Sequence, residues 1–156
     1  MVRIYCKNTG TSKEFVEGAY LKDIATEFEF DKPYDILAAL VNNVAQGLRF
    51  KVYHSLDVQF LDYRTYTGRN FYCRSLCFLL YKAVKDLFPE SKLTIRRPIS
   101  KGYYCSVDKG DGSAIGDADV EAVKKRMQEI VAQDIPFKRH EARVEDAIKT
   151  FTAIGA

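Results

Sequence analysis

Residues 2–28, VRIYCKNTGTSKEFVEGAYLKDIATEF, decide how the first part of the chain folds, because the spacing of their apolar residues changes once along the stretch. At its start, Val2, Ile4 and Cys6 alternate with polar or amphipathic neighbours, which is typical of a strand with one buried face. After a polar turn the alternation resumes over residues 12–16. Together these two stretches predict an antiparallel hairpin.

The same segment then switches to helical spacing. Leu21, Ile24, Ala25 and Phe28 lie at positions i, i+3, i+4 and i+7, so they line one face of a helix. Further extended segments follow, separated by turn residues, at 36–41, 50–53 and 58–61. This half predicts a β-β-α unit followed by about three strands, a compact sheet packed over one helix.

The second half predicts a different α+β layer. A helix is expected from about Phe71 to Phe88, where apolar residues recur at spacings of three and four until Pro89. Beyond it the pattern predicts strands at 92–97 and 103–107, a loop at 108–116, a helix that Asp117 or Asp119 helps to start, a strand at 137–143 and a helix at 144–151. We therefore expect domains at 1–63 and 71–156, joined by a polar linker at 64–70.

Composition restricts the class of protein. The chain has 156 residues, of which 47% are hydrophobic and 29% charged, the balance of a globular domain rather than of a disordered segment. Its apolar runs are far shorter than the roughly 20 residues that a bilayer span needs, and its start does not resemble a secretory signal. We expect a cytoplasmic protein without a membrane partner, whose cysteines are reduced thiols.

Charge is distributed unevenly. Residues 1–63 carry seven Lys and Arg against nine Asp and Glu, whereas residues 64–156 carry seventeen against twelve. The second half therefore favours an anionic partner, although a generic solvated surface fits the same numbers. Aromatic residues stand close to arginines and could stack bases while the arginines hold phosphates, but ordinary packing explains the same pattern. The candidate nucleic-acid-binding residues are Arg64, Arg69, Arg74, Arg96 and Arg97, near Tyr63, Tyr66, Phe71, Tyr72, Tyr103 and Tyr104.

The glycine-rich loop 110–116 precedes a predicted helix and superficially resembles a phosphate loop. It lacks the Lys-Ser/Thr pair of such loops and carries carboxylates that would repel a phosphate. We interpret it as a connecting loop, so no nucleotide or other cofactor site is expected in this segment.

Cys73 and Cys77 lie four residues apart on a predicted helix, so their sulfurs could converge on one metal ion. A tetrahedral site needs two further ligands, and the remaining candidates, Cys6, Cys105, His54 and His140, stand at no recognisable spacing. We therefore expect no metal site and interpret the two thiols as small apolar side chains of a packed helix face. A thiol-based metal or redox sensor remains an alternative.

Several phrases of the sequence are similar to known modules. Residues 1–63 resemble a TGS domain, the small ubiquitin-like β-grasp module, in the phrases VRIY at 2–5, KEFVEG at 13–18, LKDIA at 21–25, VNN at 41–43 and DVQFL at 57–61. Residues 69–151 resemble the beginning of the editing-type domain that follows TGS in threonyl-tRNA synthetases, in SLCFLLYKAVKDLFP at 75–89, PISKGYY at 98–104 and VKKRMQEIV at 123–131. The resemblance implies an α+β fold, a β-grasp TGS domain followed by a truncated editing-like domain.

The departures from the synthetase pattern concern chemistry. That family places two histidines four residues apart on the first helix of the editing domain, and the matching positions here hold Cys73 and Cys77. The family's second Cys/His motif lies later, and the chain ends at Ala156 before reaching it. The resemblance therefore implies no catalytic residue in this segment, no hydrolysis of mischarged tRNA, and exposed apolar surface on an unfinished second domain.

The same phrases also resemble a family of bacterial nucleoside (uridine) kinases that carry this pair of domains ahead of a P-loop kinase domain. That resemblance predicts a non-catalytic N-terminal regulatory or binding region of a uridine kinase. Its partner would be the C-terminal kinase domain, which would hold ATP and Mg²⁺, with RNA or a small molecule as a further ligand. The alternative is a tRNA-binding and editing N-terminal fragment of a threonyl-tRNA synthetase.

Overall fold

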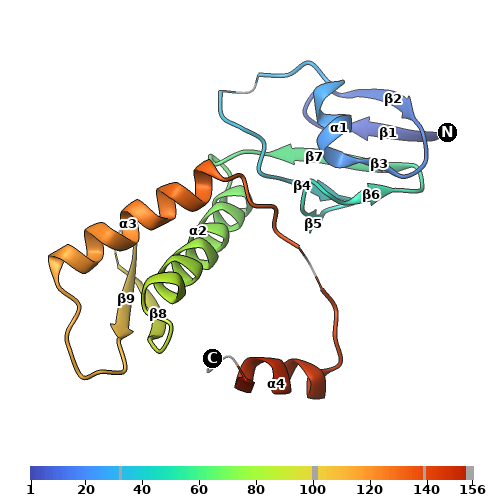
Figure 1. Cartoon of the computed structure of the whole chain (residues 1–156). Helices are drawn as coiled ribbons and strands as arrows, with labels where there is room; N and C mark the ends of the chain where they lie inside the picture. The colour runs from blue at the N-terminus through green and yellow to red at the C-terminus, as the bar shows by residue number, and fades with distance from the viewer. Residues whose placement is uncertain (32, 100–101, 139, 154–156) are drawn as a thin grey trace. The chain divides into compact units, whose positions relative to one another are not determined.

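The computed structural model describes residues 1–31, 33–99, 102–138 and 140–153 (Figure 1). The chain divides into two compact units, Met1–Ser75 and Leu76–Ala156, here called the first and the second unit. Helices and strands occur in both, which confirms the predicted α+β class.

A five-stranded sheet with the order β2-β1-β7-β4-β5 forms the first unit. Strand β1 (Val2–Cys6) pairs antiparallel with β2 (Thr11–Phe15), so the predicted hairpin is confirmed, and it pairs parallel with β7 (Leu56–Leu61). Strand β4 (Ala38–Val41) runs antiparallel to both β7 and β5 (Val44–Gln46). A central parallel pair flanked by hairpins is the β-grasp arrangement that the TGS resemblance implies.

Helix α1 (Leu21–Thr26) packs its apolar face against this sheet. Leu21, Ile24 and Ala25 are buried on it, and Phe28 is buried just beyond its end, as the spacing predicts. A small second sheet pairs β3 (Ala19–Tyr20) with β6 (Lys51–Val52). The core of the unit consists of Val2, Ile4, Cys6, Leu21, Ile24, Ala25, Phe28, Ala39, Val41, Val52, Val58 and Phe60.

The turn between β4 and β5 confirms the turn expected at Asn42 and Asn43. Both residues have positive φ, 47° and 67°, the left-handed conformation that a tight two-residue hairpin requires and that asparagine tolerates. Strand β5 itself was not predicted. It has three residues, and Val44 in it is 59% exposed, so no buried face marks it in the sequence.

Helix α2 (Tyr66–Leu87) begins before Phe71, where the apolar pattern placed its start, so that predicted start was wrong. The missed signal is Thr65, whose hydroxyl accepts a hydrogen bond from the Gly68 N–H at 3.1 Å and donates one to the Asp62 carbonyl at 2.9 Å. This is the bonding of a helix N-cap. Residues 66–70, expected to be a linker, therefore belong to the first turns of the helix.

Gly68 is buried, and a Cβ at this position would lie far inside contact distance of the Asp62 carbonyl oxygen. We expect Gly68→Ala to lower the free energy of unfolding of the first unit by about 1–3 kcal/mol, because backbone must move to admit one methyl group. Amide hydrogen exchange of β1, in the sheet of the same unit, measures this change. Gly47→Ala is the control, since a Cβ there meets no atom within 4 Å. Equal effects of the two substitutions would contradict the prediction.

The second unit contains the hairpin of β8 (Lys92–Ile99) and β9 (Gly102–Asp108), helix α3 (Asp117–Ala132) and helix α4 (Val144–Ala153). These elements confirm the predicted strands and helices of this half. The expected strand at 137–143 was wrong: its described residues form no strand. The physical reason is that a strand needs a neighbour, and the described strands of this unit pair only with each other.

The core of the second unit is small. Its buried residues are Ala83 and Val84 of α2 with Val123 and Ile130 of α3, and Leu79, Leu80, Phe88, Leu93, Val107 and Met127 pack partly buried against them. Among the described residues, no helix combines the length and apolar character that a membrane span requires.

An ion pair joins the two long helices of this unit. The Asp86 carboxylate accepts hydrogen bonds from Arg126 Nε at 3.0 Å and Nη2 at 2.8 Å, and from Lys82 Nζ at 3.0 Å. Burial raises the pKa of Asp86, but the hydrogen bonds from Arg126 and Lys82 outweigh it and hold the pKa below its usual range. The guanidinium of Arg126, which donates two hydrogen bonds to Asp86, therefore joins α3 to α2 at neutral pH.

Candidate nucleic-acid interface

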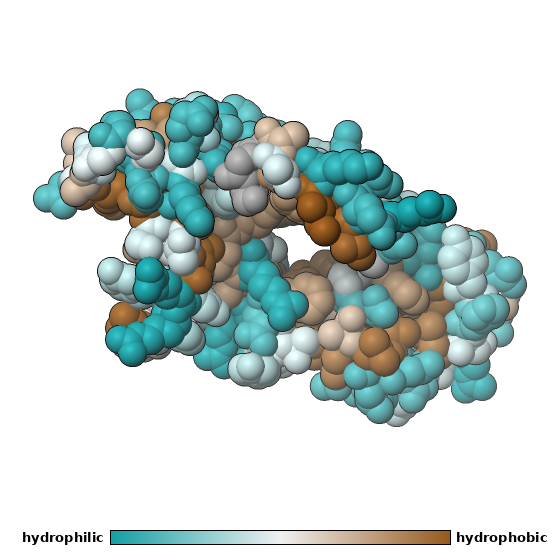
Figure 2. All heavy atoms as spheres, turned by 90° about the horizontal axis from the view of Figure 1, so that it is seen from below, coloured by the Kyte–Doolittle hydropathy of each residue, from teal (hydrophilic) through white to brown (hydrophobic). Residues whose placement is uncertain are grey.

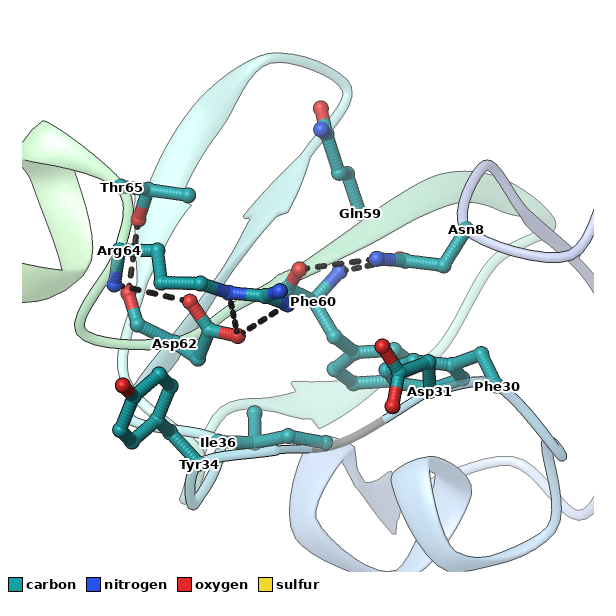
Figure 3. A pocket seen from close by; sticks show the side chains of 10 residues that line it. All are labelled: Asn8, Phe30, Asp31, Tyr34, Ile36, Gln59, Phe60, Asp62, Arg64 and Thr65. Atoms are coloured by element: carbon teal, nitrogen blue, oxygen red, sulfur yellow. Dashed lines mark hydrogen bonds and ion pairs between the residues drawn. The ribbon is translucent and has the colours of Figure 1, made fainter.

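Arg64 follows β7 and lines a cavity of about 210 Å³ in the first unit (Figure 3). Its Nε and Nη2 lie 2.9 and 2.7 Å from Asp62 Oδ2, and its guanidinium lies 6.0 Å from the centre of the Tyr34 ring. The hydrogen bond from Arg64 lowers the pKa of Asp62. The charge of Arg64 is thus matched by a carboxylate of its own unit, which makes this candidate a weak phosphate ligand.

The other groups of this cavity are also bonded to one another. The Asn8 side-chain amide donates to the Phe60 carbonyl at 3.1 Å and accepts from the Phe60 N–H at 2.7 Å, as the dashed lines in Figure 3 show. The Phe30 and Phe60 rings stack with centres 5.8 Å apart. These contacts join separate strands and loops of the unit, so the cavity is best explained by packing.

Arg69 and Arg74 are exposed on α2. Five residues on a helix correspond to about 140° around its axis, so the two arginines lie on different sides of α2. Arg69 stands four residues before Cys73, on the same side of the helix. The two candidates therefore do not form a joint site on this helix.

Arg96 and Arg97 lie at an irregularity of the β8–β9 hairpin. Ile95 pairs with Cys105 and Pro98 pairs with Tyr103, so both arginines face the single residue Tyr104 across the strands. Such a bulge adds a residue to one strand and increases its local twist. The sequence showed adjacent arginines but carried no signal for the bulge.

The bulge region is open to solvent. Arg96 and Arg97 are exposed, and within the described part of the chain neither makes an ion pair. Tyr103 and Tyr104 of the facing strand are 46% and 51% exposed. Unmatched cations beside accessible aromatic faces can hold phosphates and stack bases. Of the predicted arginines, these two have the geometry that suits an anionic polymer best.

Three thiols lie on α2 and β9. Cys73 and Cys77 are partly buried, one helical turn apart. Burial, and then the neighbouring Cys77, raise the pKa of the Cys105 thiol, so this thiol resists ionisation at neutral pH. The proximity of Cys77 to Cys105 could not be derived from spacing, because it depends on how β9 packs on α2. In the described residues, no group of three or more His, Cys, Asp or Glu could hold a metal ion.

A carboxylate of α3 holds both ends of the loop at 108–116. Asp119 accepts a hydrogen bond from the Gly116 N–H at 3.0 Å and forms an ion pair with Lys109 at 2.7 Å. The bond from Gly116 and the Lys109 ammonium lower the pKa of Asp119. The carboxylate thus binds the N-terminus of α3, as the sequence predicts for Asp117 or Asp119, and leaves no cationic cradle for a phosphate there.

A β-grasp unit followed by a helix-hairpin-helix unit defines the class of this chain, and comparison with known proteins gives its relatives. It is 30% identical over 142 residues to a threonine-tRNA ligase of Porphyromonas gingivalis, covering 91% of this chain and 22% of that protein. It is 30% identical over 151 residues to that of Desulforamulus reducens, covering 97% and 23%. It is 28% identical over 155 residues to that of Natranaerobius thermophilus, covering 99% and 24%.

Nearly the whole chain is thus similar to threonyl-tRNA synthetases, and it spans about a quarter of the length of these curated relatives. No model of a protein family matches it. The similarity to threonyl-tRNA synthetases that the phrases indicated is confirmed.

The relatives contradict the prediction of a nucleoside kinase. They are tRNA ligases, so the interpretation of the chain as the regulatory region of a uridine kinase was wrong. Two of the three phrases on which it rested lie in α2 and α3, where they supply core residues of the second unit, and the third lies at the β8–β9 hairpin. Packing motifs identify the domain that they build but carry no information on what is attached to it. The expected C-terminal kinase domain with its ATP and Mg²⁺ depended on that resemblance alone.

Proposed function

We propose that this chain is the N-terminal, tRNA-contacting region of a threonyl-tRNA synthetase-type protein. The observation that carries the proposal is similarity along 91–99% of the chain to threonine-tRNA ligases. The net positive charge of residues 64–156 and the exposed arginines of the β8–β9 bulge support it, because RNA binding rests largely on phosphate neutralisation.

The proposed role is binding without cleavage. The resemblance to the synthetase family matches Cys73 and Cys77 to two histidines four residues apart, and the proposed role rests on that match. An imidazole takes up and releases protons near neutral pH and can position water through both nitrogens, whereas a thiol is a poor substitute in either role. The chain would therefore contact tRNA but lack the side chains that activate water to hydrolyse the aminoacyl ester.

Binding of a threonine tRNA transcript, followed by fluorescence anisotropy at increasing salt, tests this function. We expect saturable binding whose log K falls linearly with log salt, with a slope of about −0.7 to −0.9 for each phosphate contacted. A single-stranded DNA of equal length is the control for charge alone and should bind more weakly. No binding at low salt, or equal binding of the DNA, would contradict the proposal. In a parallel assay, mischarged tRNA should keep its amino acid at the uncatalysed rate.

A further inference from the structure

An apolar groove of about 450 Å³ lies open on the second unit. It is lined by Phe78 and Leu79 of α2, Ile130 of α3, and the segment 135–138 that leaves α3. Phe78 and Phe137 are 59% and 56% exposed, and their ring centres lie 5.6 Å apart. Figure 2 shows hydrophobic residues, in brown, at the surface on the face of the molecule that it draws. A second apolar face that covers such a groove stabilises the folded unit, because apolar surface is removed from water.

Helix α4 carries an apolar face that no other described residue of the chain buries. Val144, Ala147, Ile148 and Phe151 lie at i, i+3, i+4 and i+7, so they form one stripe. No residue of α4 is buried, and Val144, Ile148 and Phe151 are 70%, 60% and 55% exposed. A helix of ten residues is marginal in water by itself, so its stability has to come from packing of this stripe.

The two faces are tethered to one another. Lys138 lines the groove and Val144 begins α4, and the chain between them can reach at most roughly 20 Å. A tether this short gives α4 an effective concentration at the groove in the millimolar range or above. Charge also matches: Lys138 stands at the groove, and Glu145 occupies the first turn of α4.

We propose that α4 closes over this groove of its own chain. Ile148 and Phe151 pack against the exposed faces of the Phe78 and Phe137 rings, and Glu145 comes to face Lys138. The closed helix completes the small core of the second unit and removes its exposed apolar surface from water. This inference does not depend on the proposed function, because it concerns only contacts within the unit.

The chain has no tryptophan, so one introduced tryptophan reports on its site alone. Phe151→Trp places it on the apolar stripe of α4, and Lys149→Trp places it on the opposite side of the same helix. In the full chain, we expect the tryptophan at 151 to be quenched by acrylamide several-fold less than the one at 149 and to emit at shorter wavelength. Protection at 151 should stay constant when the protein is diluted.

A third variant locates the contact. Phe137→Ala in the Phe151→Trp chain should raise quenching to the level of Lys149→Trp. Phe137 is half exposed and lies outside the helices, so its loss leaves the buried core in place, and circular dichroism verifies this. Equal quenching at 151 and 149 overturns the proposal. Protection that disappears on dilution assigns the groove to a second copy, and protection that survives Phe137→Ala assigns α4 to another surface; either result overturns it too.

Discussion

Phe28→Ala is expected to lower the free energy of unfolding of the first unit by about 3–5 kcal/mol. The Phe28 side chain is 1% exposed and belongs to the core of the first unit, with its ring centre 6.0 Å from that of Phe15. Truncation removes a fully buried ring and leaves a cavity that a sheet held by hydrogen bonds on both sides can only partly close. The cost therefore includes both the lost burial and the lost contacts around the cavity.

The measurement has to report on the first unit alone, because a chain of two units can unfold in two steps. Amide hydrogen exchange of β1, which pairs on both sides, gives the local free energy of opening. Val44→Ala on the exposed β5 is the matched control and should change this free energy by no more than about 0.5 kcal/mol. A loss below about 1 kcal/mol for Phe28→Ala would show that this ring is not a core residue.

The joint substitution Arg96→Ala and Arg97→Ala is expected to weaken binding of the tRNA transcript by tens of fold at about 0.1 M salt, and to reduce the slope of log K against log salt by about 2. Both arginines project from a bulge, beside two exposed tyrosines, and neither is matched by a carboxylate among the described residues. Each can therefore release one counterion from the RNA when it binds a phosphate.

Lys124→Ala with Lys125→Ala removes the same charge from the exposed surface of α3 and is the control. If this pair weakens binding as much as the arginine pair, the effect is net charge and the hairpin is not the contact. If the unaltered chain binds no tRNA, the proposed function itself fails. The two failures are thus distinguishable in one titration series.

The elements that could be predicted from the sequence are those that local spacing determines. The β1–β2 hairpin, the buried face of α1, the asparagine turn and the β8–β9 hairpin all appear where alternation, helical spacing or turn residues indicate them. The same holds for the similarity to threonyl-tRNA synthetases, which rests on phrases of the sequence.

Three features of the structure, two of them at candidate site residues, could not be predicted. Arg64 looked like a cation available to phosphate, but a neighbouring carboxylate binds it. Gly68 looked like a linker residue, but it lies where the first turns of α2 approach the Asp62 carbonyl. Arg96 and Arg97 share one partner across the hairpin because of a change in strand register.

The sequence by itself determined most of the helices and strands and the side of each that is apolar, because backbone geometry repeats with a short period and directs side chains accordingly. Only the tertiary structure decided which charges are neutralised, which thiols lie near one another and which apolar faces lack a partner. Those properties depend on contacts between residues distant in the chain, whose distances follow from packing and strand register rather than from spacing.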